Sequence, residues 1–281
     1  MMIAQITDMH VRPRGRLAYG RVDTNAMLAA AVATLEALPR KPDLVIATGD
    51  LTDCGLAEEY EVLRDILDPL SMPVYLVPGN HDRRAELLAE FGPDGYLPTD
   101  GGFLHYAVDG HPVRLIGLDT VVPGYGHGEM CAARLSWLEA RLGEAPGRPT
   151  LIFMHHPPFG AGLADMDRIN CRNGVAMAAV VSRFGNVERV LCGHHHRPIT
   201  VRWAGTIGSV APSTAHQVTL DLIPDESPAS FTMEPPGLQL HLWSSTAGLV
   251  THTLPIGTYE GPFPFVLDAD YPGHSNKAEA A

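Results

Sequence analysis

Short apolar runs recur along the chain, and each has the composition of a strand that is buried on both faces. These runs cover residues 2–7, 44–47, 74–77, 150–154 and 187–192. Between them lie longer segments with apolar residues at helical spacing, at residues 24–38, 56–67, 83–91, 131–142 and 175–184. The alternation of strands with helices predicts an α/β fold that contains parallel strands.

Other segments have the pattern of antiparallel strands. They are 103–108 with 113–118 around the Asp109-Gly110 turn, several strands within 200–222, and a final hairpin of 238–243 with 249–254. The polar segment 160–174 is irregular, and we interpret it either as an ordinary surface loop or as the wall of a neighbouring site. A loosely patterned tail begins at Gly261.

Five of the apolar runs end in residues that can bind metal ions. The endings are D-M-H at 8–10, G-D at 49–50, G-N-H-D at 79–82, H-H-P-P at 155–158 and G-H-H-H at 193–196. Taken singly, Asp50 is more often a helix cap or a turn former than a metal ligand, and Gly79-Asn80 by itself favours an ordinary turn. Because the carboxyl ends of strands in an open α/β sheet gather at one edge, the five endings together predict one shared site.

The side chains at these endings are suited to metal binding. In a strand, residues i and i+2 point to the same side, so we expect Asp8 with His10, and His194 with His196, to converge while His195 points away. Asp, His and Asn are ligands for Fe, Mn, Zn or Co. Their number exceeds what one ion requires and suits two ions, roughly 3.5–4 Å apart, that share a bridging carboxylate.

Composition and charge narrow the classes of function. The chain has 281 residues, 45% of them hydrophobic, which suffices for one large domain or one domain with a small appendage. Asp and Glu number 32 against 20 Lys and Arg, a net charge of -12, which argues against a nucleic acid polymer as partner. The four cysteines form no disulfide framework, and no signal peptide or membrane-spanning run is visible, so we expect a cytoplasmic protein without a membrane partner.

The ordered set D-x-H, G-D, G-N-H, H-x-P and G-H-x-H resembles the calcineurin-like metallophosphoesterase superfamily over residues 1 to 200. The forms G-D-L-T-D-C-G and G-N-H-D are most similar to its bacterial class III phosphodiesterase branch, which includes glycerophosphodiesterases and cyclic-nucleotide phosphodiesterases. Protein phosphatases of the superfamily favour Arg and Glu where this chain has Cys54 and Asp82.

The resemblance implies a fold that the strand pattern alone does not separate from a doubly wound sheet. It implies an α/β protein with a four-layer α/β/β/α sandwich and a small C-terminal β cap. We therefore expect a dimetal core at 1–199, a β-rich cap or dimerisation extension at 200–260 and a tail at 261–281. A homo-oligomer, either a dimer or an assembly of dimers, is also implied by the resemblance.

The resemblance further implies roles for single residues. The metal ligands would be Asp8, His10 and His196 at the first ion, Asn80, His155 and His194 at the second, and Asp50 between the two. The family pattern skips His156 and His195. Catalysis would involve Asp50, Asn80 and His81, with His81 touching the phosphate or the leaving group. The predicted substrate-binding residues are Asn80, His81, Arg12 and Tyr19. Arg12 and Tyr19 lie in the loop after D-M-H, and the alternative interpretation of this loop is a solvated turn without a role in binding.

The function implied is a phosphodiesterase that hydrolyses small phosphodiesters, either glycerophosphodiesters or 3′,5′-cyclic nucleotides, by attack of a metal-bound hydroxide. A phosphomonoesterase or a nuclease on the same scaffold is the alternative, and the nuclease would use a local basic groove that includes Arg12, Arg14, Arg16 and Arg21. A catalytically inactive binding module is a third hypothesis. Such a module should lack ligands, and here all seven ligand positions are filled.

Overall fold

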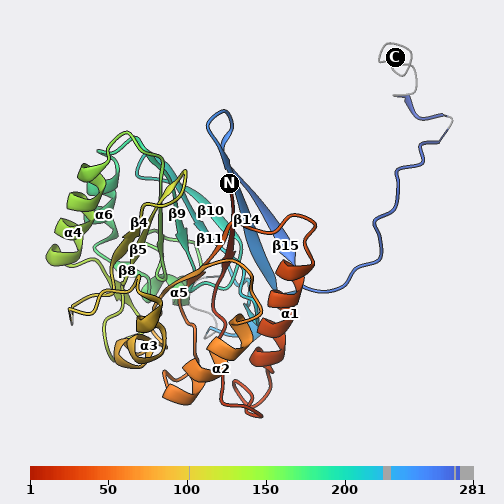
Figure 1. The fold of residues 1–281 in the computed structure, drawn as a ribbon, viewed down its shortest axis with the longest axis horizontal. Coiled ribbons are helices and arrows are strands. Elements are labelled where there is room, and N and C mark those ends of the chain that lie inside the picture. The colour runs from red at the N-terminus through yellow and green to blue at the C-terminus, as the bar shows by residue number, and fades with distance from the viewer. Residues whose placement is uncertain (101, 224–228, 269, 273–281) are drawn as a thin grey trace.

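Two β-sheets lie face to face with helices on their outer sides (Figure 1). The structure is a computed structural model and describes residues 1–100, 102–223, 229–268 and 270–272. The first sheet has the order β15-β14-β1-β2-β3, from β1 (Met2–Ile6), β2 (Leu44–Thr48), β3 (Val74–Val77), β14 (Gly237–Ser244) and β15 (Gly248–Pro255). The second has the order β10-β11-β9-β7-β5-β4, from β4 (Tyr106–Val108), β5 (Arg114–Leu118), β7 (Thr150–Met154), β9 (Val187–Cys192), β10 (Ile199–Trp203) and β11 (Thr206–Val210).

Each sheet has a parallel centre and antiparallel edges. Strands β1, β2 and β3 run parallel to one another, as do β5, β7 and β9. The edges are antiparallel where β14 pairs with β1, β15 with β14, β4 with β5 and β10 with β11. Because the central strands are parallel, their carboxyl ends, which carry the metal-binding motifs, lie at one end of the two sheets.

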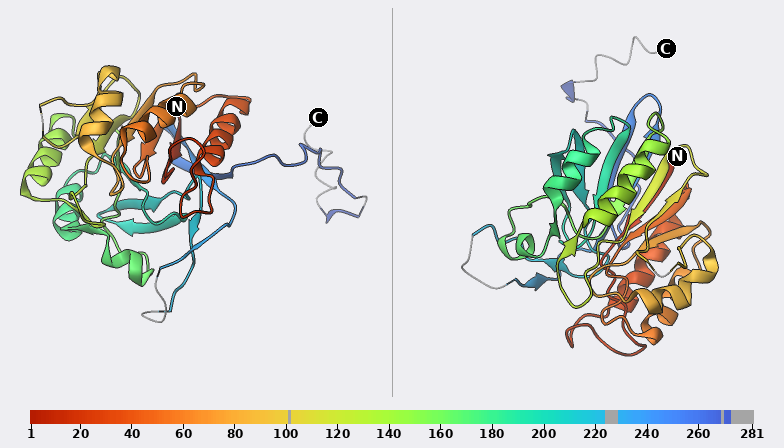
Figure 2. Two further views of the ribbon diagram at one scale, coloured as in Figure 1. Left: turned by 90° about the horizontal axis from the view of Figure 1, so that it is seen from below. Right: turned by 90° about the vertical axis from the view of Figure 1, so that its left-hand side faces the viewer.

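The helices complete four layers. Helices α1 (Thr24–Ala37), α2 (Ala57–Leu67) and α3 (Arg84–Phe91) cover the first sheet, and a 3₁₀ turn, η1 (Gly92–Asp94), follows α3. Helices α4 (Ala132–Glu144) and α6 (Gly174–Val181) cover the second sheet, on the opposite side of the molecule (Figure 2). The four-layer α/β/β/α sandwich is confirmed. A doubly wound sheet is excluded because each sheet has helices on one face and the other sheet on its second face.

The apolar run of β7 shows why the strands are hydrophobic on both sides. Leu151 and Phe153 belong to the core that contains the first sheet, whereas Ile152 and Met154 belong to the core beneath α4 and α6. All four side chains are fully buried. Alternate residues therefore fill two different cores, which is the burial expected of a strand between two layers.

The segment 160–174 is more ordered than its polar composition suggested. It contains the short helix α5 (Ala164–Arg168) and the strand β8 (Cys171–Arg172), which pairs with β6 (Gly128–Glu129). The Asp167 carboxylate accepts hydrogen bonds from the backbone N–H groups of Ala161 and Gly162, at 2.8 and 2.9 Å. A side chain that satisfies the backbone in this way organises a turn without apolar periodicity.

The residues of the expected extension, 200–260, are distributed over several parts of the fold. Strands β10 and β11 complete the second sheet, and β14 and β15 complete the first. Of the described residues within 200–260, only β12 (Gln217–Val218) and β13 (Phe231–Thr232) form a strand pair outside the two large sheets. The division into a core, a cap and a tail stays a prediction, and residues 224–228 of the expected cap lie outside the described part.

The C-terminal tail extends away from the body of the molecule in Figures 1 and 2. Phe263 and Phe265 are exposed there, at 74% and 98% of their surface. Residues 269 and 273–281 of the predicted tail lie outside the described residues. Within the described residues, the structure contains no helix of the length and apolar character that crossing a membrane requires.

Candidate metal centre

The five predicted strand ends meet in one place, but turns and not strand alternation bring their side chains together. Strand β1 ends at Ile6 and β9 at Cys192, so Asp8, His10 and His194 lie in the loops that follow. Asp8, His10, Asp50, His194 and His196 all have positive φ, between 45° and 73°. Residues other than glycine seldom adopt this backbone conformation, and they do so mainly at functional sites.

Four buried side chains form a first group of ligand atoms. Asp8, His10, Asp50 and His196 each offer one atom, and these atoms all lie within 4.8 Å of one another. The Nε2 atoms of His10 and His196 are 3.2 Å apart, and Asp8 Oδ1 is 3.3 Å from His196 Nε2. Asp50 Oδ2 lies 3.8 Å from His10 Nε2. The group therefore combines two imidazoles with two carboxylates in a space the size of one coordination sphere.

A second group adjoins the first through Asp50. His155 Nε2 lies 3.3 Å from Asp50 Oδ2 and 3.2 Å from Asn80 Oδ1. The ring of His194 packs against that of His155, with centroids 5.0 Å apart. The same oxygen of Asp50 thus faces His10 on one side and His155 on the other, which is the position that a shared ligand requires.

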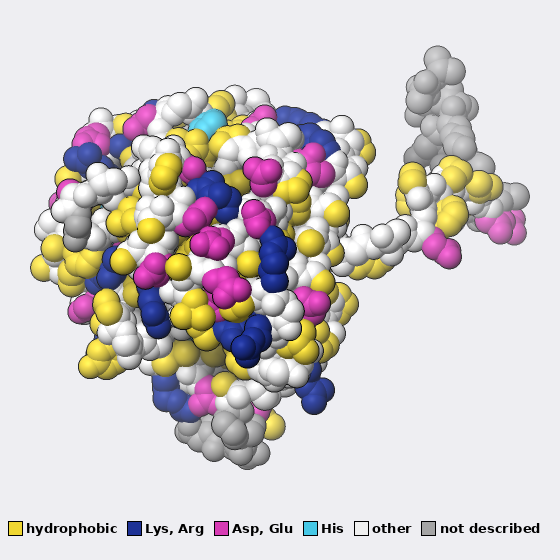
Figure 3. Space-filling model, turned by 60° about the horizontal axis from the view of Figure 1, so that its bottom comes forward, with side chains coloured by type: hydrophobic (Ala, Val, Ile, Leu, Met, Phe, Trp, Pro, Cys, Tyr) yellow, Lys and Arg dark blue, Asp and Glu magenta, His cyan; other side chains and the backbone are white. Residues whose placement is uncertain are grey.

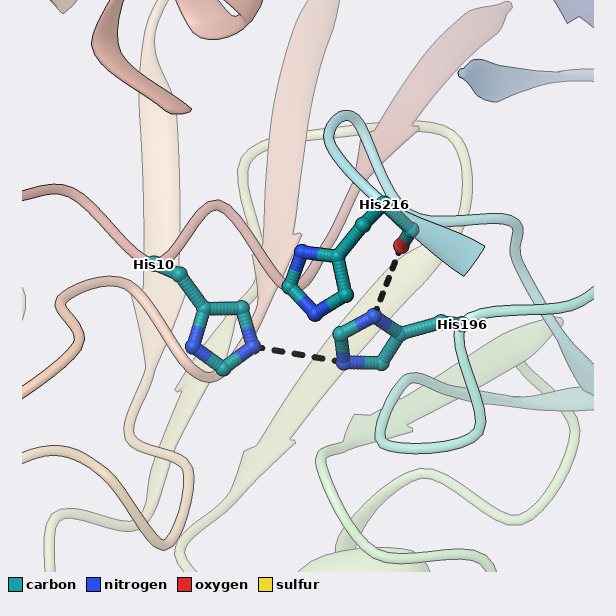
Figure 4. Close-up of side chains that lie close together, drawn as sticks. All are labelled: His10, His196 and His216. Carbon is teal, nitrogen blue, oxygen red and sulfur yellow. Dashed lines mark hydrogen bonds between the residues drawn. The ribbon is translucent and has the colours of Figure 1, made fainter. Parts of the chain in front are cut away.

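Three of the histidines use the same arrangement to present Nε2 to the centre. The Nδ1–H groups of His10, His155 and His196 donate to Asp53 Oδ1, the Thr48 carbonyl and the His216 carbonyl, at 3.2, 2.8 and 2.9 Å. Figure 4 shows His10 and His196 facing each other beside His216. A hydrogen bond at Nδ1 sets the tautomer and the ring orientation, and it leaves Nε2 available as a ligand.

The close packing of carboxylates and imidazoles shifts the pKa values of several residues of the centre. Burial by itself would raise the pKa of Asp50, but the charges of His155 and His81 outweigh it and hold that pKa well below its usual value. Burial lowers the pKa of His155, and the Asp50 carboxylate overcomes this effect and raises it to about 9. For His194, burial, followed by the charges of His156 and His155, lowers the pKa strongly and outweighs the smaller opposing effect of Asp50.

The donor set fits a pair of divalent ions. Two nitrogens bound to one ion at about 2.1 Å, with an angle between 90° and 109°, lie about 3.0–3.4 Å apart. The separation of 3.2 Å between His10 Nε2 and His196 Nε2 falls in that range. Asp8 on one side and Asn80 on the other add oxygen donors, and Asp50 lies between them. Nitrogen with oxygen donors, and no thiolate, suits Fe, Mn, Zn or Co.

The two histidines skipped by the family pattern are buried beside the centre. His156 is held by a 2.7 Å hydrogen bond between its Nδ1 and the Thr120 hydroxyl, and one of its nitrogens lies within 4.8 Å of those of His155 and His194. His195, expected to point away, is also buried, and its Nε2 donates to Asn170 Oδ1 at 2.7 Å. It therefore ties the histidine loop to the 160–174 segment.

His81 lies at the edge of the centre. Its Nδ1–H donates to the backbone carbonyl of Asp53 at 2.7 Å, which directs Nε2 toward Asp50 Oδ2, 3.9 Å away. Its backbone N–H donates to Asp50 Oδ1 at 3.0 Å. The side chain is 31% exposed, so it is accessible to a substrate.

Arg12 and Tyr19, both predicted to touch substrate, differ in their surroundings. The Arg12 guanidinium lies 2.8 Å from Glu59 Oε1 and 3.3 Å from Asp53 Oδ2 and contacts the Cys54 thiol. Tyr19 lines a cavity directly above the ligand groups. The substrate roles of both residues stay predictions.

That cavity, which we call the inner pocket, has a volume of about 260 Å³. Its walls include His81, Met166 and three aromatic rings, Tyr19, His216 and Phe231, whose centroids are 5.0–5.2 Å apart. Sequence reasoning missed His216, because it belongs to no motif and follows His196 by 20 residues. The segment after β11 leads back to the metal centre and places His216 beside His10 and His196, which the tertiary structure alone shows.

One face of the molecule is seen to carry mixed charge (Figure 3). On the face shown in Figure 3, Lys and Arg side chains are separated by acidic and hydrophobic ones and form no continuous basic area. Of the four arginines considered for a basic groove, Arg12 and Arg14 form ion pairs with Glu59 and Asp65 respectively. This distribution does not favour binding of a nucleic acid backbone.

Comparison with known proteins defines the class of this site. Residues 1–198 match the model of the calcineurin-like phosphoesterase family, and the chain belongs to that family. Over 266 residues it is 40% identical to a protein of Arcobacter nitrofigilis named probable glycerophosphodiester phosphodiesterase, covering 94% of this chain and 97% of the relative. It is 31% identical over 215 residues to the 3′,5′-cyclic adenosine monophosphate phosphodiesterase of Escherichia coli strain K12, covering 76% of each chain.

A solved structure shows the same fold at low identity. The crystal structure of a dimetal phosphatase from Danio rerio superposes with a TM-score of 0.60 and 16% sequence identity, covering 92% of this chain and 99% of that chain. The resemblance inferred from the motifs is therefore confirmed by the family match, by the relatives and by the fold.

Proposed function

We propose that this chain is a dimetal phosphodiesterase that hydrolyses small phosphodiesters, with glycerophosphodiesters as the first candidate substrates. The observation that carries the proposal is the position of Asp50 Oδ2, 3.8 Å from His10 Nε2 and 3.3 Å from His155 Nε2. One carboxylate between two groups of ligands is what a pair of ions requires. The names of the two relatives support the choice of phosphodiesters.

Each residue of the centre has a proposed role. Asp8, His10 and His196 would hold one ion, Asn80, His155 and His194 would hold the other, and Asp50 would be shared between them. When bound, the two ions supply Lewis acidity and lower the pKa of water, so that phosphorus can be attacked at neutral pH. The hydrogen bonds at Nδ1 of His10, His155 and His196 keep the ligand nitrogens oriented, so the centre needs little rearrangement when it loads.

His81 is the proposed catalytic residue that touches the substrate. The Asp53 carbonyl orients its ring, and Nε2 faces the ligand groups. Burial lowers the pKa of His81, but the nearby Asp50 charge outweighs this effect and raises it. A proton held at Nε2 can donate a hydrogen bond to a phosphate oxygen or to the departing alkoxide, which stabilises charge that develops in the transition state.

The shape of the inner pocket suits small ester groups. Its volume of about 260 Å³ is below the range of about 300–1,000 Å³ that drug-sized ligands occupy. A glycerol unit fits this space. Binding of a polymer would need an extended basic groove, and the mixed charge in Figure 3 does not favour one on that face.

A second candidate substrate class, 3′,5′-cyclic nucleotides, is favoured by the aromatic wall of the inner pocket. The rings of Tyr19, His216 and Phe231 lie within 5.2 Å of one another, centroid to centroid. Tyr19 is 54% exposed, so its ring is open to a planar ligand. Stacking of a nucleobase on such a ring is worth about 1–3 kcal/mol.

A substrate panel tests the proposal. The metal-free protein is loaded separately with Mn, Zn, Co or Fe, its metal content is measured, and each form is assayed. The panel contains bis(p-nitrophenyl) phosphate, p-nitrophenyl phosphate, glycerophosphoethanolamine and 3′,5′-cyclic AMP. We expect diester turnover with about two ions per chain. Preference for the monoester would favour a phosphatase, and full loading without turnover of any compound would favour a binding module.

Two finer expectations belong to this proposal. The four cysteines are free thiols, which supports a reducing cytoplasmic location. The homo-oligomer implied by the family resemblance stays a prediction, and light scattering coupled to size-exclusion chromatography measures it directly.

A further inference from the structure

A second cavity opens beside the inner pocket and shares two residues with it. This cavity, which we call the side pocket, has a volume of about 710 Å³. Asn80 and His81 line both cavities, whereas Arg83, Arg84 and Tyr125 line only the side pocket. The two cavities therefore meet at the residues that, in the proposed function, lie next to the scissile phosphate.

The charged groups of the side pocket differ in whether they already have partners. The Arg84 guanidinium forms a two-point pair with Asp119, with Nη2 2.8 Å from Oδ1. Asp53 is held by Arg12 and by His10. Asp82 accepts hydrogen bonds from the backbone N–H groups of Leu51 and Gly79 and from the Tyr60 hydroxyl, at 3.0, 2.8 and 3.0 Å. The charge of each of these side chains is therefore already compensated by ion pairs or hydrogen bonds within the protein.

Arg83 is the exception. It is exposed, and the structure records no ion pair for it within the described ranges. Its backbone N–H donates to the Tyr60 hydroxyl at 2.9 Å, which holds the base of the side chain. Its aliphatic stem lies over Gly55, where an added Cβ would come within 2.6 Å of Arg83 Cγ. The side chain is thus anchored at its root and leaves its cationic end free at the pocket.

We propose that the side pocket binds the second ester group of a linear phosphodiester, and that Arg83 recognises a carboxylate or phosphate on that group. The inference rests on the proposed function, because it places phosphorus between the ligand groups and His81. One ester group then extends into the inner pocket, and the other extends past His81 toward Arg83. An arginine fork matches the planar oxygens of a carboxylate or a phosphate, which a neutral alcohol lacks.

The proposal distinguishes between the two candidate substrate classes. In a 3′,5′-cyclic nucleotide both ester oxygens belong to one sugar, so its substituents cannot extend into two separate cavities. In a linear diester the two alcohols are independent. The structure therefore favours linear diesters with one anionic alcohol as the substrates that use the whole site.

A matched pair of substrates tests the role of Arg83. The two compounds are p-nitrophenyl 2-carboxyethyl phosphate and p-nitrophenyl 2-carbamoylethyl phosphate, which differ in charge and hardly in shape. For Arg83→Gln we expect the ratio of kcat/KM for the carboxylate diester to that for the amide diester to fall about tenfold. Turnover of the amide diester should stay within about twofold of wild type. Arg83→Lys, which keeps the charge, should retain part of the ratio.

The control is Arg202→Gln, which removes an exposed charge from β10 outside both cavities. An unchanged ratio in Arg83→Gln, or an equal loss in Arg202→Gln, would overturn the assignment of Arg83 to an anionic group. In both cases turnover of the amide diester would leave the phosphodiesterase function standing. If the metal-loaded wild type turned over neither compound, the proposed function itself would fail and this inference with it.

Discussion

The carbonyl oxygen of Thr48 lies 2.8 Å from Nδ1 of His155 and accepts a hydrogen bond from its N–H group. Thr48 is the last residue of β2 in the first sheet, and His155 directly follows β7 in the second. This hydrogen bond joins the two sheets and also directs His155 Nε2 toward Asp50 and Asn80. The packing of the sandwich and the assembly of the metal centre therefore depend on the same contacts.

Removing the shared carboxylate should disable both halves of the centre. In Asp50→Ala we expect kcat/KM for a diester to fall by more than about a hundredfold, beyond the 10–100-fold typical of residues that only orient ligands. Metal content should fall below one ion per chain. Asp65→Ala is the control, because Asp65 is exposed on α2 and its ion-pair partner within the described part of the chain is Arg14. Near-normal turnover of Asp50→Ala with two bound ions would show that Asp50 does not bridge.

Asp53 is predicted to act through the two histidines that it positions. Its carboxylate accepts from His10 Nδ1 at 3.2 Å, and its carbonyl accepts from His81 Nδ1 at 2.7 Å. In Asp53→Asn the carbonyl contact stays while the carboxylate charge is lost. We expect metal affinity, measured by competition with a chelator, to fall about 10–100-fold.

The control for this prediction is Asp109→Asn, which removes a half-exposed carboxylate that pairs with Arg114 and Arg148 far from the centre. Full metal affinity in Asp53→Asn would mean that the contact with His10 does not influence the ligand. Equal losses in the two variants would indicate a general effect of charge.

Gly193, between β9 and His194, leaves no room for a side chain. An added Cβ would overlap the Thr7 hydroxyl and lie 2.7 Å from the Thr48 carbonyl oxygen. Because overpacking typically costs about 1–3 kcal/mol, we expect Gly193→Ala to lower Tm by several degrees and to weaken metal binding. Gly185→Ala is the matched control, since nothing lies within 4 Å of its Cβ. Calorimetry of both variants would refute the prediction if their Tm values agreed.

A buried histidine that belongs to none of the groups of ligand atoms predicts a dependence of stability on pH. His241 is fully buried, and its Nδ1 and Nε2 lie 2.8 and 3.1 Å from Thr251 Oγ1 and Gln5 Oε1. Burial, with a smaller contribution from Arg189, lowers its pKa from 6.5 to about 3. In the folded state His241 is therefore neutral, while in the unfolded chain it binds a proton below pH 6.5.

Since the unfolded state binds more protons between pH 6.5 and 3, the contribution of His241 to stability is present above pH 6.5 and is lost as the pH falls through that window. From pH 7.5 to 5.0 the wild type should lose about 2 kcal/mol more free energy of unfolding than His241→Gln. Urea unfolding at both pH values measures the difference. The same pH dependence in both proteins would contradict the assignment.

The local sequence determined much of this protein. The bounds of β3, β7 and β9 agree with the apolar runs, because each run is short and is ended by Pro, Gly or His. Asp23, which directly precedes α1, caps the helix by accepting a hydrogen bond from the N–H of Ala26, an interaction that lies within one turn of the chain. The types of metal ligand could also be predicted, because each motif contains its own ligand residues and directly follows a predicted strand.

What only the tertiary structure decided is which distant segments meet. Strand β14 pairs with β1, placing Leu242 opposite Met2, and the alternating pattern of the C-terminal third does not specify that partner. His216, and Arg83 with its side pocket, likewise carry no motif. A local pattern reflects which face of an element is buried. Contacts between segments far apart in the chain depend on how whole layers pack, so their partners become defined only when the two sheets close on each other.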